Sequence, residues 1–315
     1  MDGRPPAVDG GGGAAVTGRW RRAAAVAGLL VLGGTAACGG PGSGPPVDGA
    51  AVSRPEAVLV PPGSRYVALG SSFAAGPGLS PVADEPCRRS AANYPRRVAD
   101  ALALDLVDLT CSGTTTDNIL TKPHDADGVE VRPQIEAVPS DAALVTVTIG
   151  GNDLALATTA TDLACIDVGE CEGYRVDRER VAGYADELED RLVAALEAVR
   201  EAAPRARVVL VTYPQILPAG GGTCAAVALT DDSARYVADL ERRLRDASVS
   251  AAGRTGSVLV DAHTASAGRD ACSADPWVGG YPTTGEGGQA FHPTAAGMAG
   301  QAALVVAALT PAARP

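Results

Sequence analysis

Residues 143–153 read ALVTVTIGGND, an almost unbroken run of apolar and β-branched residues that ends abruptly at two glycines. Such a run is typical of a strand that is buried on both faces of a parallel sheet. Residues 207–213, RVVLVTY, repeat the pattern. The chain has five predicted strands, and two of them are the runs Ala143–Ile149 and Arg207–Tyr213. The other three are Tyr66–Gly70, Leu104–Thr110 and Ser257–Ala262.

Amphipathic helices are expected between these strands. One apolar face recurs at spacings of three and four, which is the helical period; its members are Val181, Tyr184, Leu188, Leu192, Leu196 and Val199. Asp177 is the expected N-cap and Pro204 marks the end. Residues 237–247 repeat the pattern, and a last helix is expected over Thr294–Leu309. Strands that alternate with helices predict an α/β fold, a three-layer α/β/α sandwich around a mostly parallel sheet.

The N-terminal part of the chain has a different composition. Residues 1–18 are rich in Gly, Pro and Ala, and the stretch RWRR at 19–22, with three arginines, precedes an apolar run over residues 23–37. This order is typical of a secretory signal, and the run is shorter than the ~20 residues that span a bilayer. We therefore expect an exported protein. Residues 1–37 are interpreted as a signal peptide with an N-terminal extension, residues 38–63 as a flexible Pro/Gly-rich tether, and residues 64–315 as one folded domain.

Cys38 directly follows Thr35-Ala36-Ala37. Bacterial lipoproteins are cut just before a cysteine that then carries lipid, so Cys38 is the expected lipidation site. The protein is then expected to be either extracellular or lipid-anchored at the outer face of the cell membrane. Cleavage after Ala37 without lipidation is the alternative, because Thr-x-Ala also suits the ordinary signal peptidase and Thr35 departs from the usual Leu, Val or Ile.

Six cysteines remain beyond Cys38. An even number in an exported chain indicates disulfides rather than a metal site, and no two of them have CxxC spacing. The sequence alone allows many pairings. We favour pairing between nearest neighbours, which gives Cys87–Cys111, Cys165–Cys171 and Cys224–Cys272. No metal ion or other cofactor is expected.

The overall composition, with 46% hydrophobic and 20% charged residues, is that of an ordinary globular protein. The formal net charge of −11 argues against nucleic-acid binding, which needs a basic surface. A nucleotide-binding α/β protein is disfavoured too, because Gly70, Gly76 and Gly78 do not fit the Gly-x-Gly-x-x-Gly pattern after the first strand.

Four short peptides carry polar groups at or near the predicted strand ends. They are GSSFAAG at 70–76, CSG at 111–113, GGND at 150–153 and FHP at 291–293. The first three begin where a strand stops, and ligand sites of open parallel sheets lie beyond the carboxyl ends of the strands. Together the peptides supply a serine, backbone N–H donors, an amide and a histidine, which are the groups that acyl transfer needs.

Each candidate has a simpler interpretation when it is taken alone. Ser72 suits a helix cap, Gly113 and Asn152 suit turns, and Asp153 is expected to cap the next helix. A neutral imidazole is the natural general base for a serine, and the chain has three histidines. His292 lies in the loop before the last expected helix. The other two are His124, expected on the surface in the polar stretch KPHDADG, and His263, which follows the fifth strand and can reach the site.

These peptides, in this order, resemble the SGNH (GDSL-type) hydrolase family, and most of all its secreted actinobacterial esterases and lipases, over residues 64–310. The resemblance implies a flavodoxin-like fold and cleavage of carboxylic esters through an acyl-enzyme on Ser72, with His292 as general base. It also implies an oxyanion hole formed by the N–H groups of Ser72 and Gly113 and the side chain of Asn152. Secreted relatives carry three disulfides at similar spacings, which supports the pairing above.

Two positions depart from the family pattern. Ser71 stands where the family usually has Asp, and Gln289 stands three residues before His292, where the family often has Asp. Glutamine does not stabilise an imidazolium as a carboxylate does. Some secreted relatives orient the ring with a main-chain carbonyl, and Ala290 supplies one here, so we expect a Ser–His dyad. Asp275 is the reserve candidate for a third group.

The same departures leave an alternative, a ligand-binding lipoprotein with the SGNH fold and impaired catalysis. As an enzyme, the protein is expected to be a monomer that acts on a small-molecule or lipid ester. Short-chain esters, lipid esters, phospholipids and acetylated glycans all fit the sequence.

Overall fold

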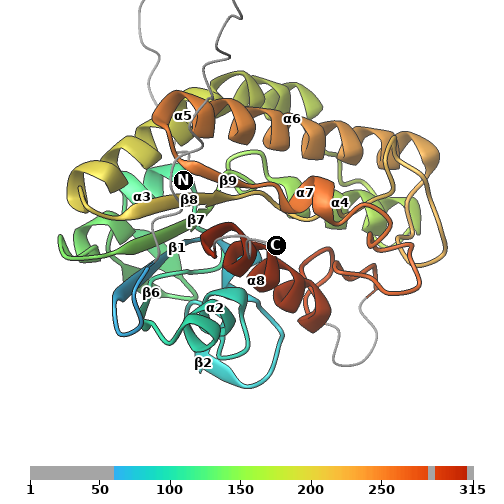
Figure 1. Cartoon of the computed structure of the whole chain (residues 1–315). Helices are drawn as coiled ribbons and strands as arrows, with labels where there is room; N and C mark the ends of the chain where they lie inside the picture. Colours follow the sequence, from blue (N-terminus) through green and yellow to red (C-terminus); the bar gives the residue numbers. More distant parts are fainter. Residues whose placement is uncertain (1–59, 283–287, 311–315) are drawn as a thin grey trace, which may run out of the picture. The chain divides into compact units, whose positions relative to one another are not determined.

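The computed structural model describes residues 60–282 and 288–310 (Figure 1). The predicted signal peptide, Cys38 and the tether up to residue 59 lie outside the described residues. None of the helices within these two ranges has the length and apolar character that crossing a bilayer requires.

The centre of the fold is a five-stranded sheet in the order β4-β1-β7-β8-β9, with every neighbouring pair parallel. The strands are β1 Arg65–Gly70, β4 Asp105–Asp108, β7 Leu144–Thr148, β8 Arg207–Val211 and β9 Val258–Val260. All five lie within or over the predicted runs. Four strands, β4, β7, β8 and β9, are shorter than predicted, and β1 begins one residue earlier. Strand β9 stops because Asp261 caps the helix that follows it. Every residue of β7 is buried, as its unbroken apolar sequence predicts.

Helices cover both faces of this sheet, which confirms the three-layer architecture (Figure 1). Helices α5 and α6 pack together on one face, and α2 and α8 pack together on the other. The longer helices are α2 Tyr94–Leu102, α4 Leu156–Asp167, α5 Arg178–Ala202, α6 Asp231–Thr255 and α8 Ala295–Leu309. The short ones are α1 Ser72–Ala75, α3 Thr116–Leu120, α7 Ala262–Ala265 and the 3-10 turn η1 Gln134–Ala137.

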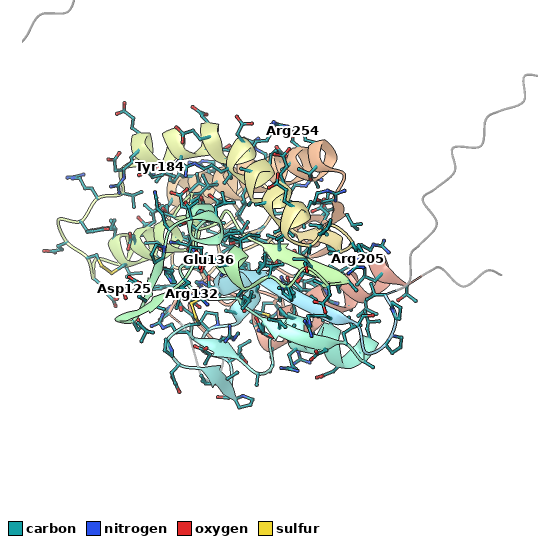
Figure 2. The ribbon with its side chains drawn as sticks, turned by 90° about the vertical axis from the view of Figure 1, so that its left-hand side faces the viewer. Asp125, Arg132, Glu136, Tyr184, Arg205 and Arg254 are labelled. Atoms are coloured by element: carbon teal, nitrogen blue, oxygen red, sulfur yellow. A yellow bond between two sulfur atoms is a disulfide. The ribbon has the colours of Figure 1, made fainter. Side chains whose placement is uncertain are left out.

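Local sequence explains where the long helices begin and end. The Asp177 side chain accepts a hydrogen bond from the N–H of Arg180 and caps α5, and this helix ends just before Pro204. Tyr184, predicted on the apolar face of α5, is instead exposed (Figure 2). Between Arg178 and Glu187 only Val181 is buried, so the first turns of α5 make little contact with the core.

Two small hairpins and three disulfides complete the described part. The hairpins are β2 Val82–Asp84 with β3 Arg89–Ser90, and β5 His124–Ala126 with β6 Val129–Val131. The disulfides join Cys87 to Cys111, Cys165 to Cys171 and Cys224 to Cys272, which are the nearest-neighbour pairs.

The strand order places a topological switch point between β1 and β7. From β1 the chain crosses to β4 on one side, whereas β8 and β9 follow β7 on the other. Open parallel sheets bind ligands at the carboxyl ends of the strands beside such a point. The segments after β1, β4 and β7 are the peptides that begin at Gly70, Cys111 and Gly150.

Candidate active site

Ser72 begins helix α1 just after β1, in a tight turn. Contacts of Gly70 with Thr148 and with Gln134 hold this turn. Gly70 has φ +142°, and a Cβ there would overlap the carbonyl oxygen of Thr148. The side-chain amide of Gln134 accepts from the N–H of Gly70 at 2.9 Å and donates to its carbonyl at 3.0 Å. This two-sided amide clamp holds the strand end that presents Ser72.

His292 lies beside Ser72 in the geometry of a general base. Its Nε2 is 2.9 Å from the Ser72 hydroxyl, and its Nδ1 is 2.7 Å from the carbonyl oxygen of Ala290. A carbonyl only accepts hydrogen bonds, so the ring proton is on Nδ1. Nε2 is then free to accept the proton of the Ser72 hydroxyl.

The surroundings of His292 keep its imidazole neutral. The side chain is 4% exposed, and burial lowers its pKa to about 4. The positive charge of Arg88 lowers the pKa further, while the Ala290 carbonyl opposes the shift. A neutral ring is the form that a general base needs.

Asn152 and Gly113 lie across from this pair. One N–H of the Asn152 amide donates to the carbonyl of Thr114 at 2.8 Å, which fixes the plane of the amide. An NH₂ group has a second hydrogen, and that hydrogen stays available for a ligand. Gly113 has φ +86°, and a Cβ there would lie 2.9 Å from Cε1 of His124. Ser72, His292, Gly113 and Asn152 all line one cavity of about 400 Å³.

Other candidates from the sequence lie elsewhere. His263 lines a different cavity, beside Glu241. Asp275 forms an ion pair with Arg269. Among the described residues, no carboxylate hydrogen bonds to His292, and no group of His, Cys, Asp or Glu side chains is arranged to hold a metal ion.

Comparisons with known proteins show the family of the chain. The sequence model of the GDSL-like lipase/acylhydrolase family matches residues 68–299. The chain belongs to this family. Lipase 2 of Streptomyces coelicolor is 36% identical over 221 residues, which cover 66% of this chain and 73% of the relative.

Two solved structures of relatives are similar across most of the domain. Phospholipase A1 from Streptomyces albidoflavus NA297 matches with a TM-score of 0.63 and 27% identity, covering 78% of this chain and 99% of that one. An extracellular lipase from Streptomyces rimosus matches with a TM-score of 0.63, 28% identity and the same coverage. The chain is thus a carboxylic ester hydrolase of the GDSL-like family, on the esterase and lipase branch found in Streptomyces.

Ser71, the first departure from the family pattern, has a structural partner. Its hydroxyl lies 2.6 Å from the hydroxyl of Tyr213, which also accepts from the N–H of Gly151 at 3.2 Å. All three residues are buried, and burial raises the pKa of Tyr213, so its proton stays in place. Tyr213 therefore joins the segment that carries Ser72 to the segment that carries Asn152. The sequence offered one signal for it, a tyrosine at the end of a predicted strand.

Asp153 differs from its predicted role. It accepts hydrogen bonds from the backbone N–H and the hydroxyl of Thr116, so it binds the first residue of α3, which precedes it in the chain, and does not cap α4, which follows. The α4 N-cap is Ala155, in a left-handed conformation with φ +49°. Asp153 thus ties the segment after β7 to the segment after β4, and burial raises the pKa of its carboxyl.

His124, predicted on the surface, lines the active-site cavity instead. The β5–β6 hairpin carries it over the second peptide, where its Nε2 is 2.8 Å from the carbonyl oxygen of Ser112. Its ring also packs against Gly113. The polar sequence around His124 is that of a surface hairpin, and only the fold of that hairpin over Gly113 brings His124 into the site.

Gln289, the second departure, faces Arg88 rather than the base. Its Oε1 accepts from Nη1 of Arg88 at 3.3 Å.

We expect Gln289→Asp to change kcat/KM by no more than roughly threefold, because the new carboxylate would form an exposed ion pair with Arg88, and such pairs contribute little free energy. Steady-state kinetics would check this, with Asp275→Asn as a second variant expected to be neutral. A large gain in Gln289→Asp would mean that a carboxylate at 289 reaches His292.

The low pKa of His292 predicts an enzyme that works in mild acid. With His292 as the expected general base, its protonation removes activity, so kcat/KM should stay high as the pH falls and decline only near pH 4, not near the ordinary histidine pKa of 6.5. Arg88→Gln removes a positive charge that lowers the pKa, so it should move the decline to higher pH. A pH–rate profile measures both effects, with exposed Arg96→Gln as the control. A wild-type decline near pH 6.5, unmoved by Arg88→Gln, would contradict the assignment.

Proposed function

We propose that the protein hydrolyses carboxylic esters through an acyl-enzyme on Ser72. His292 Nε2 takes the hydroxyl proton as Ser72 Oγ attacks the ester carbonyl. The N–H groups of Ser72 and Gly113 and the amide of Asn152 stabilise the resulting oxyanion. His292 then returns the proton to the departing alcohol, and a water molecule activated by the same ring releases the acid.

The observation that carries the proposal is the line of contacts from Ser72 Oγ through the imidazole to the carbonyl of Ala290, at 2.9 and 2.7 Å. In this proposal the Ala290 carbonyl is the backbone orienter that replaces a third acidic group. It holds the proton on Nδ1 and stabilises the imidazolium that forms when Ser72 is deprotonated.

A fluorophosphonate probe tests this proposal against the ligand-binding alternative. The probe reacts with serines that an adjacent base activates. Wild-type protein should be labelled stoichiometrically at Ser72, and Ser72→Ala should not be labelled. A folded wild-type protein that stays unlabelled at high probe concentration would favour a ligand-binding protein without catalysis.

The oxyanion hole predicts a positioning role for His124. The carbonyl of Ser112 and the N–H of Gly113 belong to one peptide group, and His124 Nε2 donates to that carbonyl. Loss of one such bond costs about 1 kcal/mol, so His124→Phe should lower kcat roughly five- to tenfold with little change in KM. His124→Gln, which keeps a donor, should restore part of the loss. Equal losses in both variants, or a change confined to KM, would contradict the role.

We also propose that the domain is exported and that Cys38 carries lipid at the end of the tether. The three disulfides and the similarity to an extracellular lipase support export. Expression of the full chain in a bacterial host tests the anchor. The wild-type protein should partition with membranes and incorporate labelled palmitate, and Cys38→Ala should do neither. Unlabelled wild-type protein in the culture medium would point to ordinary signal-peptide cleavage.

A further inference from the structure

We propose that the cavity selects esters with a short acyl chain on a polar alcohol that carries no negative charge. This inference rests on the proposed function, because it concerns substrates of the site around Ser72. It concerns a substrate class that the names of the relatives, a lipase and a phospholipase A1, do not specify.

The described residues that line the cavity offer no apolar channel for a long acyl chain. Among the described residues that line it, none is Leu, Ile, Val, Met, Phe, Tyr or Trp. The apolar side chains there are those of Pro86, Ala126 and Ala157. Burial against apolar side chains is what makes a longer acyl chain bind better, by roughly fourfold per methylene. Without such walls, additional methylene groups stay in contact with water or polar groups and gain nothing.

Helix α4 lines one side of the cavity with polar groups. Thr158 lies one helical turn before Thr161 and Asp162, so the three side chains share one face of the helix. The Thr161 hydroxyl donates to the carbonyl of Ala157, but the half-buried Asp162 carboxylate has no hydrogen-bond or ion-pair partner among the described residues. A carboxylate is a strong acceptor, so a substrate hydroxyl or cation near α4 has a ready partner.

The charges around the cavity disfavour anions. Among the residues with described positions, Asp125, Asp127 and Asp162 line it, together with one cation, Arg88. Figure 2 shows Asp125 on the β5–β6 hairpin. Arg88 is engaged, because its Nε lies 3.6 Å from Asp127 and its Nη1 donates to Gln289. A phosphate or free carboxylate on the substrate would therefore meet uncompensated negative charge from Asp125 and Asp162.

The acyl-chain part of the proposal is tested with monomeric p-nitrophenyl acetate, butyrate and octanoate. We expect kcat/KM to be highest for acetate or butyrate and at least tenfold lower for octanoate. The double variant Thr158→Leu/Asp162→Leu gives α4 an apolar face, and it should raise the octanoate-to-acetate ratio several-fold. A wild-type preference for octanoate, or an unchanged ratio in the folded double variant, would overturn this part.

The charge part is tested with three acetate esters of matched size: those of choline, of its uncharged isostere 3,3-dimethylbutanol, and of the anionic 2-hydroxyethanesulfonate. The anionic ester should have the lowest kcat/KM, by at least tenfold. Asp162→Asn should reduce the ratio of kcat/KM for the neutral ester to that for the anionic ester several-fold. Added salt should reduce the same ratio in the wild type. Asp186→Asn, an exposed position on α5 outside the cavity, should leave it unchanged. Equal rates for the anionic and neutral esters would overturn this part.

Labelling of Ser72 by the fluorophosphonate probe keeps the two failures apart. If Ser72 is unlabelled and no ester is cleaved, the proposed function fails. If Ser72 is labelled but octanoate or the anionic ester is cleaved as well as short neutral esters, only the inference about substrates fails.

Discussion

Replacing His292 with alanine is expected to reduce kcat for ester hydrolysis by on the order of 10⁴-fold or more. Without the imidazole, the Ser72 hydroxyl keeps its proton at neutral pH and is a weak nucleophile. The oxyanion donors and the cavity would remain, so substrate binding should change much less than turnover. The loss should therefore fall on kcat rather than on KM.

The measurement is steady-state kinetics on p-nitrophenyl acetate, together with the fluorophosphonate labelling rate. Both should collapse in His292→Ala while the melting temperature stays close to the wild-type value. His263→Ala is the matched control, because that ring lines a different cavity, and it should retain nearly full activity. Loss of activity in His263→Ala with His292→Ala active would reverse the assignment of the base.

Asn152→Ala should be the next most damaging substitution, with a loss of about 10²–10³-fold in kcat, the usual effect of removing one oxyanion donor. The Asn152 amide is already oriented, because one of its N–H groups donates to the Thr114 carbonyl. Pre-orientation matters because the donor then needs no rearrangement as charge develops on the substrate oxygen. KM should change little, since the oxyanion exists only in the transition state.

Two further variants sharpen the test of Asn152. Asn152→Asp keeps the size of the side chain but replaces the donor with negative charge, so it should be at least as impaired as Asn152→Ala. Asn118→Ala, which alters the capping of α3 away from the cavity, should lose stability rather than kcat. If Asn152→Ala kept more than a tenth of the wild-type kcat, another group would have to be the third oxyanion donor.

Much of the fold follows from local patterns that need no knowledge of the folded chain. The apolar run over β7 predicts a strand buried on both faces, and the run over β8 does the same. Leu188, Leu192 and Leu196 recur at helical spacing and are all buried in α5. Tyr184 lies on the same predicted face but is exposed, because periodicity defines a face without defining how far the neighbouring layer covers it.

The candidate site was predictable where a strand end points to it, and the family resemblance added His292 and Ala290. Ser72, Gly113 and Asn152 follow β1, β4 and β7, and the parallel topology brings their segments to one edge of the sheet. Gln134 and His124 follow no strand of that sheet. They reach the site from η1 and the β5–β6 hairpin, through contacts with residues 64 and 12 positions away in the chain, so no local pattern reveals them.

The sequence by itself determined the layered α/β fold, the family and the residues that begin at the strand ends, because these depend on short periodic patterns and on peptides read in order. The tertiary structure alone decided how those residues are connected. It showed that Tyr213 joins Ser71 to Gly151 and that polar side chains line the cavity. Such contacts depend on the directions of side chains from segments far apart in the chain, and packing sets those directions only once the whole domain has folded.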